Sequence, residues 1–381
     1  MKVLVIAMNS PVPPDRGDRL RAWDVLETLS AYAEVHLLML TNERLTAEGE
    51  LLLNERGICL HQACPRRTEI VQALARSIML GRPWGLLEMP RLQDIAEKLG
   101  SDWDAVVGLQ LKSAYYAYCL PARIRILDLT DSLALYRQDL GLTRNILRWM
   151  SLTGVAQAEA FWAGKFDVGL VCTDRDASVI RTHNPRAALQ VVENGTRPWQ
   201  EPVTESDKTT VLFVGDLKYP PNRDGVKFLV NDIWPSIHSA LPHLRLRVVG
   251  RGGKEISRML RAQGVDWVGY VDDLKQEFRS AIALLNTVRY GSGSRRKVLD
   301  AWSAGVPVVS TKKGAAGLDY IPGKHLLEAE TPSEFVQTLL HLADHPQVWR
   351  ELSLAGWDKA QQCEVSRIWD PVWRRLIGSQ R

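Results

Sequence analysis

The chain has 381 residues, of which 45% are hydrophobic and 24% are charged. This composition is that of an ordinary globular protein, which excludes a disordered or fibrous chain, and the length suits two α/β domains better than one. The 48 Lys and Arg against 44 Asp and Glu leave a formal net charge of +4. Over this length the charge is too small to indicate nucleic acid as a partner.

The first half of the chain alternates short apolar runs with segments of helical period. Runs rich in Val, Ile and Leu predict strands at 2–8, 34–40, 105–109, 125–128 and 168–171, and helices are predicted at 19–31 and 91–99. This order is typical of a parallel sheet covered on both faces. The apolar run at 3–8 is too short for a signal peptide or a membrane span, so we expect a cytoplasmic protein with at most peripheral membrane contact.

A polar stretch at 201–210 separates this half from a second series of the same kind, and we place the linker there. Strands are predicted at 211–214, 244–249, 267–268, 281–286, 307–310 and 325–329, and helices are predicted to begin near Asp224, Lys254, Lys275, Arg296 and Pro332. The predicted fold is α/β, with one doubly wound domain from 1–200 plus 364–381 and a second from 201–363. A ligand is expected between the strand ends of the two.

The five cysteines are odd in number and scattered along the chain, at Cys59, Cys64, Cys119, Cys172 and Cys363. They form no CxxC pair, and we find no histidine near them at metal-ligand spacing. This usage favours a reducing compartment. We expect no metal site.

The segment 290–311 is the most informative part of the sequence. Small residues at 291–294 follow a predicted strand and precede a helix, so backbone N–H groups and the helix N-terminus can hold an anion. Lys297 is expected to meet phosphate, and Asp300, one turn later, to accept hydrogen bonds from sugar hydroxyls. Gly305 is predicted to end the helix. The alternative is a solvated loop with a basic helix start.

The loop at 9–21 is a second candidate, because it follows the first predicted strand and leads into a helix. Gly17 permits close approach of the backbone, and Arg19 and Arg21 can neutralise phosphate. The loop can equally be a proline-stiffened cover for the end of the sheet.

The loop at 213–225 opens the second half as 9–21 opens the first. Gly215, Lys218 and Arg223 can bind a diphosphate or its sugar. Asn222 either contacts a ligand or caps the following helix. The glycines at 250–253 do not form GxGxxG and are weak evidence for a dinucleotide.

Together these segments resemble glycosyltransferase family 4, in particular the bacterial sugar transferases of exopolysaccharide-type clusters. The likeness also includes 125–132, 191–197 and 228–235, spans nearly the whole chain and is more specific in the C-terminal half. It implies the GT-B fold, in which two Rossmann-like domains face a central cleft. The tail at 365–376 resembles the segment that returns to the first domain, and its tryptophans are expected to be packing anchors.

The resemblance also implies an activity. The C-terminal domain would bind a nucleotide-sugar donor, with UDP- or GDP-sugar expected, and the N-terminal domain would bind a glycan, lipid-linked or small-molecule acceptor. The sugar would be transferred to an acceptor hydroxyl with retention of configuration, without a metal or a cofactor. The family's two carboxylates, eight residues apart, fall at Ser292 and Asp300, so Asp300 is expected to hold the ribose.

The site residues implied by the resemblance fall into three groups. The catalytic residues would be Lys297, Arg223 and Asp131, which would act on the leaving diphosphate and the acceptor hydroxyl. The donor would contact Gly17, Gly215, Lys218, Asn222, Ser292, Gly293, Ser294, Lys297, Val298 and Asp300. The acceptor side would be formed by Asp18, Arg19 and Gln110.

Two other functions remain as alternatives. Ser292, Asp18 and Gln110 depart from the family pattern, which would suit a catalytically degenerate GT-B module that only binds. A Rossmann-type NAD-dependent oxidoreductase is the second alternative. The absence of GxGxxG near residue 10, and of an acidic residue at the end of the second strand, argues against it.

Overall fold

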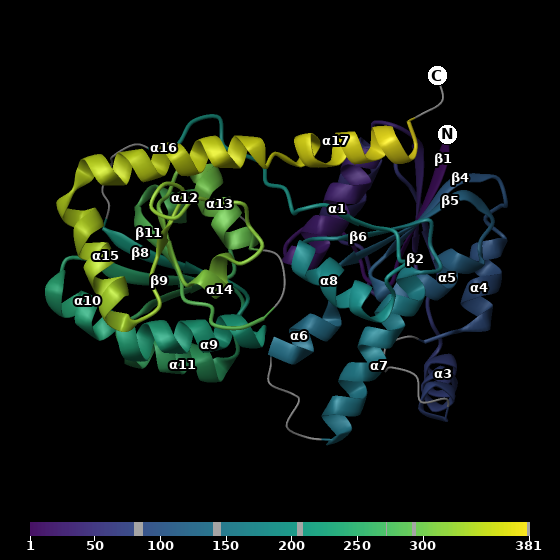
Figure 1. Ribbon diagram of the computed structural model, residues 1–381, viewed down its shortest axis with the longest axis horizontal. Coiled ribbons are helices and arrows are strands. Elements are labelled where there is room, and N and C mark those ends of the chain that lie inside the picture. Colours follow the sequence, from purple (N-terminus) through teal and green to yellow (C-terminus); the bar gives the residue numbers. More distant parts are fainter. Residues whose placement is uncertain (80–86, 140–145, 204–208, 272, 292–294, 379–381) are drawn as a thin grey trace. The chain divides into compact units, whose positions relative to one another are not determined.

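The computed structural model describes residues 1–79, 87–139, 146–203, 209–271, 273–291 and 295–378 (Figure 1). The chain divides into two compact units. Unit 1 contains Met1–Glu193 and the C-terminal segment Val365–Arg381, and unit 2 contains Asn194–Gly291 and Arg295–Glu364. Within the described residues, no helix combines the length and the apolar character needed to cross a membrane.

Unit 1 is built on a seven-stranded parallel sheet with the strand order β3-β2-β1-β4-β5-β6-β7. The central strands are apolar along their whole length because helices cover both faces of the sheet. From Val3 onward, for example, every residue of β1 is buried. The strands are β1 (Lys2–Ala7), β2 (Glu34–Met39), β3 (Cys59–Gln62), β4 (Trp103–Leu109), β5 (Ala122–Thr130), β6 (Val168–Val171) and β7 (Leu189–Val191).

The helices of unit 1 pack on the two faces of this sheet. They are α1 (Gly17–Leu29), α2 (Ala47–Glu55), α3 (Arg67–Met79), α4 (Pro90–Glu97), the 3₁₀ turn η1 (Leu111–Ser113), α5 (Ala114–Cys119), α6 (Leu133–Asp139), α7 (Ile146–Ala163), α8 (Asp174–His183) and α17 (Val365–Leu376). One apolar cluster joins the sheet to α1, α2 and α17, and another joins its opposite face to α3, α4, α5, α7 and α8.

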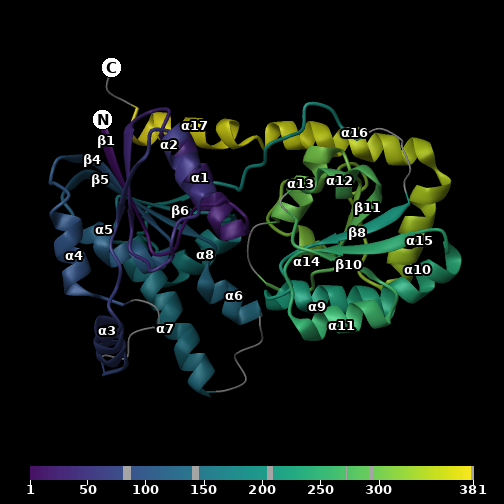
Figure 2. The same cartoon turned by 180° about the vertical axis from the view of Figure 1, so that it is seen from behind.

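The C-terminal helix α17 lies beside α1, as both views show (Figures 1 and 2). Trp369 and Trp373 are fully buried in the apolar cluster that α17 shares with α1 and the sheet. The indole N–H of Trp373 donates to Thr28 Oγ1 at 2.8 Å. Both tryptophans are therefore packing anchors of unit 1.

Unit 2 is built on a six-stranded parallel sheet with the order β10-β9-β8-β11-β12-β13. Its strands are β8 (Thr210–Val214), β9 (Arg245–Val249), β10 (Asp266–Gly269), β11 (Ala281–Asn286), β12 (Val308–Ser310) and β13 (Leu327–Glu328). Its helices are α9 (Pro220–Phe228), the π-helical stretch η3 (Leu229–Ile233), α10 (Trp234–Ala240), α11 (Lys254–Ala262), α12 (Lys275–Arg279), α13 (Arg296–Ala304), α14 (Lys312–Ala315), α15 (Pro332–Asp344) and α16 (Pro346–Gln362).

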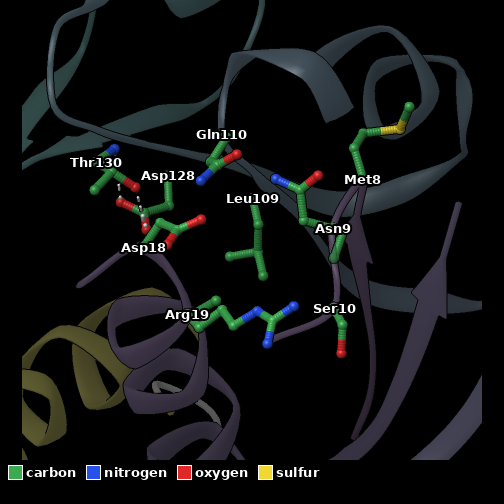
Figure 3. A pocket seen from close by; sticks show the side chains of 11 residues that line it. Met8, Asn9, Ser10, Asp18, Arg19, Leu109, Gln110, Asp128 and Thr130 are labelled. Atoms are coloured by element: carbon green, nitrogen blue, oxygen red, sulfur yellow. Dashed lines mark hydrogen bonds between the residues drawn. The ribbon is translucent and has the colours of Figure 1, made fainter. Parts of the chain in front are cut away.

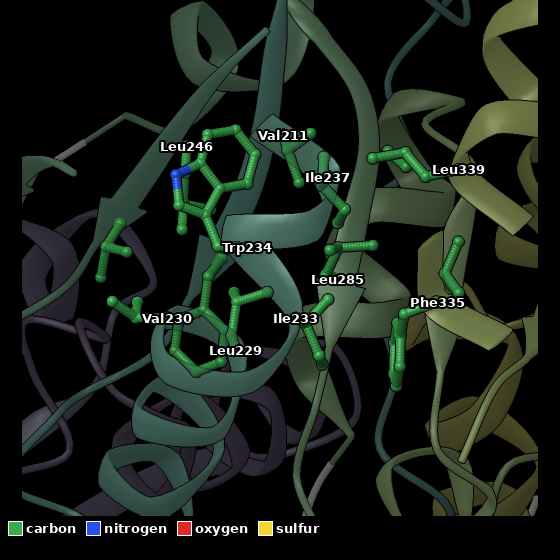
Figure 4. Close-up of a cluster of buried hydrophobic side chains, with 14 of the residues drawn as sticks. Val211, Leu229, Val230, Ile233, Trp234, Ile237, Leu246, Leu285, Phe335 and Leu339 are labelled. Atoms are coloured by element: carbon green, nitrogen blue, oxygen red, sulfur yellow. The ribbon is translucent and has the colours of Figure 1, made fainter. Parts of the chain in front are cut away.

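Helices α9 and α11 cover one face of this sheet, and α12, α13 and α16 lie on the other (Figures 1 and 2). One large apolar cluster of unit 2 contains Trp234 and Phe335, which pack against residues of the strands (Figure 4). Helix α13 ends at Gly305, whose φ of 72° is the left-handed conformation that favours glycine. The predicted helix stop at Gly305 is confirmed.

All the strands predicted from the apolar runs are present, most with ends shifted by one or two residues. Helices α11, α12, α13 and α15 begin at the predicted residues. Helix α9 begins at Pro220 and not near Asp224, because proline suits the first positions of a helix. The edge strands β3 and β7 were not predicted, since they are short and only partly buried.

Candidate functional site

Lys297 lies in the first turn of α13, directly after the loop that follows β11. Its Nζ donates to Asn222 Oδ1 at 2.8 Å and lies 4.6 Å from the ring centroid of Phe213. Burial, together with the nearby charge of Arg295, lowers the pKa of Lys297 to about 7. Among the described residues no carboxylate pairs with this ammonium group. An anionic ligand would therefore supply the negative charge that the described residues do not provide for this ammonium group.

Asn222 holds the position of Lys297 and is itself held by the backbone. Its Nδ2 donates to the carbonyl of Asp216 at 3.0 Å, which leaves Oδ1 as the acceptor for Lys297. A Cβ on Gly215 would lie 2.8 Å from Asn222 Cγ, so only glycine leaves room for this side chain. The N-cap of α9 is Tyr219. The interpretation of Asn222 as a helix cap is therefore wrong.

Lys218 and Arg223 flank Asn222 on the exposed side of this segment. The amide of Lys218 donates to Asp216 Oδ1 at 2.8 Å, and Arg223 follows Asn222 in the first turn of α9. Two exposed cations thus accompany the more buried Lys297.

Asp300 forms its hydrogen bond with Arg296, and not with Asn222, the partner of Lys297. Its Oδ1 accepts from Arg296 Nε at 3.1 Å, and Arg296 also donates through Nη1 to the carbonyl of Gly195 at 2.5 Å. The side chain of Asp300 keeps 26% of its exposure, so it remains accessible to a ligand. Val298 is fully buried and its amide donates to Arg295, which leaves it a packing role. The predicted residues Ser292, Gly293 and Ser294 lie outside the described residues.

A small pocket, partly open to solvent, lies at the carboxyl ends of β1, β4 and β5 in unit 1 (Figure 3). The predicted acceptor-side residues Asp18, Arg19 and Gln110 all line it, together with Met8, Asn9, Ser10, Asp128 and Thr130. None of the last five was predicted individually, although Asn9 and Ser10 lie in the candidate loop 9–21, and Asp128 and Thr130 lie in the segment 125–132. In a parallel α/β sheet this edge is the usual place for a ligand.

Two residues of this pocket have strained backbones. Gln110 has φ 63° and ψ 158°, and Thr130 has φ 62°. For residues other than glycine such conformations cost about 1–3 kcal/mol and occur mostly at functional sites. Gln110 is held there because its N–H donates to the Asp128 carbonyl at 2.7 Å and its carbonyl accepts from Ser113. The surrounding structure therefore fixes the strained turn.

The arginines of α1 have different roles. Arg19 is partly buried and pairs with Asp15 at 3.3 Å and with Glu43 at 2.9 Å. Arg21 is fully buried, and its guanidinium donates to both carboxylate oxygens of Asp128 and to the carbonyl of Val192. The expectation that Arg21 neutralises phosphate is therefore wrong.

The buried charge of Arg21 is stabilised from two sides. Burial is the largest single effect and disfavours the charged form, but Asp128, Cys172 and Asp131 together outweigh it and raise the pKa of Arg21. The guanidinium also lies 5.0 Å from the ring centroid of Trp369.

Gly17 is exposed at the start of α1, and a Cβ there would meet no atom within 4 Å.

The segment after β5 contains Asp131 and is held by a buried carboxyl group of α7 that the sequence did not reveal. Asp131 is half-buried and contributes to the charge around Arg21. Glu159 of α7 accepts from Ser132 Oγ at 2.8 Å and from the amide of Leu133 at 2.5 Å, at the start of α6. Burial raises the pKa of Glu159 to about 7. Glu159 thus fixes the segment that carries Asp131.

Two parallel, Rossmann-like α/β units define the class of this protein as the GT-B fold. Residues 208–345 match the family model described as "Glycosyl transferases group 1", which supports a glycosyltransferase. An uncharacterized 44.6 kDa protein in the cps region of Klebsiella pneumoniae is 21% identical over 95% of this chain and 96% of its own length.

Solved structures share the whole fold at low sequence identity. The structure of Anabaena Alr3699/HepE in complex with UDP and glucose has a TM-score of 0.73 and 15% identity, over 99% of this chain and 100% of that one. Sucrose-phosphate synthase from Thermosynechococcus elongatus has a TM-score of 0.71 and 14% identity, over 100% of both chains. TarM has a TM-score of 0.74 and 10% identity, over 99% of both chains.

Proposed function

We propose that this protein is a retaining glycosyltransferase, which moves a sugar from a nucleoside diphosphate to a hydroxyl of a glycan, lipid-linked or small-molecule acceptor. One observation carries the proposal: the ammonium of Lys297 is fixed by Asn222 at the start of α13, with no carboxylate partner among the described residues. Such a group at a helix N-terminus is suited to a diphosphate.

In the proposed reaction the bond between the anomeric carbon and the diphosphate oxygen breaks, and a bond from that carbon to the acceptor oxygen forms. The acceptor proton passes to the leaving diphosphate. Lys297, with Arg223 and Lys218 close in sequence to its partner Asn222, would stabilise the charge that develops on the leaving group. Asp300, partly exposed and oriented by Arg296, would bind the ribose hydroxyls. No metal ion takes part in this scheme.

The strained pocket of unit 1 is proposed to bind the acceptor. Asp18 and Gln110 present hydrogen-bonding groups there, and Asp131 belongs to the adjoining segment after β5. Carboxylates and amides suit the hydroxyls of a sugar or glycerol-like acceptor. Departures of Asp18 and Gln110 from the family pattern would then alter acceptor choice and not donor binding.

The relatives are consistent with this proposal. The matched structures include complexes with UDP, with UDP and glucose and with UDP-glucose, and the Klebsiella relative is encoded in a cps region. We therefore propose a UDP-sugar as the first donor to test, with GDP-sugars second, and surface polysaccharide synthesis as the setting.

The proposal is tested by a thermal-shift screen of UDP-, GDP-, ADP- and TDP-sugars on the full chain, with NAD as a negative control. A ligand at about a hundredfold excess over its Kd is expected to raise Tm by about 5–10 °C. The hit is then incubated with cell extract to detect transfer. Stabilisation by NAD but by no nucleotide sugar would overturn the proposal, whereas tight donor binding without turnover would identify a binding module instead.

A further inference from the structure

Three potential metal ligands meet on one face of the β2–β3 edge of unit 1, away from the residues discussed so far. Strands β2 and β3 pair in parallel, with His36 opposite Cys59 and Leu38 opposite His61. Cys59 and His61 are two residues apart on a strand and so point to the same face. The register therefore brings His36, Cys59 and His61 together.

Their spacing is that of ligands around a tetrahedral ion. His36 Nδ1 lies 3.0 Å from His61 Nε2, and Cys59 Sγ lies 3.5 Å from the same His61 Nε2. All three ligand atoms lie within 4.8 Å of one another. Zinc bonds of about 2.0–2.1 Å to nitrogen and about 2.3 Å to sulfur give tetrahedral separations of about 3.3 Å and about 3.6 Å. The two separations that involve His61 are therefore within about 0.3 Å of those values.

A carboxylate and an aromatic ring orient the first of these ligands. Glu34 Oε1 accepts from His36 Nε2 at 3.0 Å, so the proton of His36 is on Nε2 and the lone pair of Nδ1 faces the cluster. The ring of Trp103 packs edge-on against His36 at 5.1 Å between centroids. A carboxylate behind a ligating histidine is the usual outer contact of a zinc site.

We propose that His36, Cys59 and His61 bind one Zn²⁺, with the fourth position open to water at the sheet edge. Binding displaces the thiol proton of Cys59 to solvent. His61, whose Nε2–H otherwise donates to His36 Nδ1, moves its proton to Nδ1 and binds through Nε2. Two neutral imidazoles and one thiolate suit Zn²⁺ and, for the same geometric reason, Co²⁺. This departs from the expectation of no metal site.

The site serves stability and not the proposed reaction. Its ligands lie in the middle of β2 and in β3, whereas the pocket of unit 1 is lined by residues at the carboxyl ends of β1, β4 and β5. The ion would cross-link the edge strand β3, which is only partly buried, to β2. Chelation should therefore lower the melting temperature and leave donor binding unchanged.

Cobalt titration of the metal-free, reduced full chain tests the proposal. We expect one equivalent to produce a thiolate-to-cobalt charge-transfer band in the near ultraviolet and intense visible bands of tetrahedral cobalt. Competition with Zn²⁺ should remove both. Cys59→Ser is expected to lose the charge-transfer band and to weaken Zn²⁺ binding by more than about 100-fold, and Glu34→Gln to weaken it by about 10- to 100-fold.

Cys119→Ser is the matched control, because Cys119 is also an exposed cysteine of unit 1. It should bind both metals like the wild type. If Cys59→Ser fails to fold, His61→Ala should abolish the tetrahedral bands. The proposal is overturned if the wild type shows no charge-transfer band, or if the band survives Cys59→Ser.

Discussion

Replacing Lys297 with methionine removes the charge and keeps much of the volume of the side chain. A hydrogen bond between a charged group and its partner contributes about 1.5–3 kcal/mol, so the affinity for a nucleoside diphosphate sugar should fall by about 10- to 100-fold. Isothermal titration of the donor found in the screen measures this loss. Lys227→Met, at an exposed position late in α9, is the matched control and should bind normally.

The pH dependence gives the same prediction a second readout. Because Lys297 has a pKa of about 7 in the free protein, its charged fraction falls from about 0.9 at pH 6 to about 0.1 at pH 8. A diphosphate diester does not titrate in this range and binds the charged form. Its affinity should therefore fall by about tenfold between pH 6 and pH 8, with proton uptake at pH 8. An equal pH profile in Lys297→Met would refute the reasoning.

Three further predictions concern the parts that support the two sites. Arg21→Met should lower the free energy of unfolding by about 3–5 kcal/mol in urea titrations, because Asp128 is left buried and unpaired; a loss below 1 kcal/mol would contradict this reasoning. Gly215→Ala should weaken donor binding with little change in fold by circular dichroism, because its Cβ displaces Asn222. The pKa of Glu159 is raised to about 7, so between about pH 4.5 and pH 7 the folded state keeps a proton that the unfolded state loses. The free energy of unfolding should therefore fall as pH rises through this range, and Glu159→Gln should reduce that slope.

The central strands of both sheets could be predicted because they are buried on both faces. Their sequences are continuous apolar runs, as in β1, β8 and β11. The edge strand β3 has the sequence Cys-Leu-His-Gln and lacks that signal, since half of it faces solvent. The Cys59–His61 spacing was overlooked for the same reason, because two ligands two residues apart indicate a shared face only once a strand is recognised.

Parts of the candidate site could be predicted from residue type, but their partners could not. Lys297 was identified because a basic residue follows a strand and a small-residue turn. Its partner Asn222 is 75 residues away in the sequence, and only the fold brings the two together. Arg19 and Arg21 look equivalent in sequence, yet a helix turns by about 200° over two residues. One therefore lies at the pocket, and the other is buried against Asp128.

The two units differ in the residues that occupy left-handed backbone conformations at their strand ends. In unit 2 the carboxyl ends of β8 and β9 are occupied by Gly215 and Gly250, and a side chain on Gly250, which has φ 141°, would collide with the Gly215 carbonyl. In unit 1 the carboxyl ends of β4 and β5 carry Gln110 and Thr130 in conformations that favour glycine. Glycine would relieve that strain, so packing alone does not explain these side chains. Both residues line the pocket, and the proposed binding of an acceptor there would give a physical reason for keeping them.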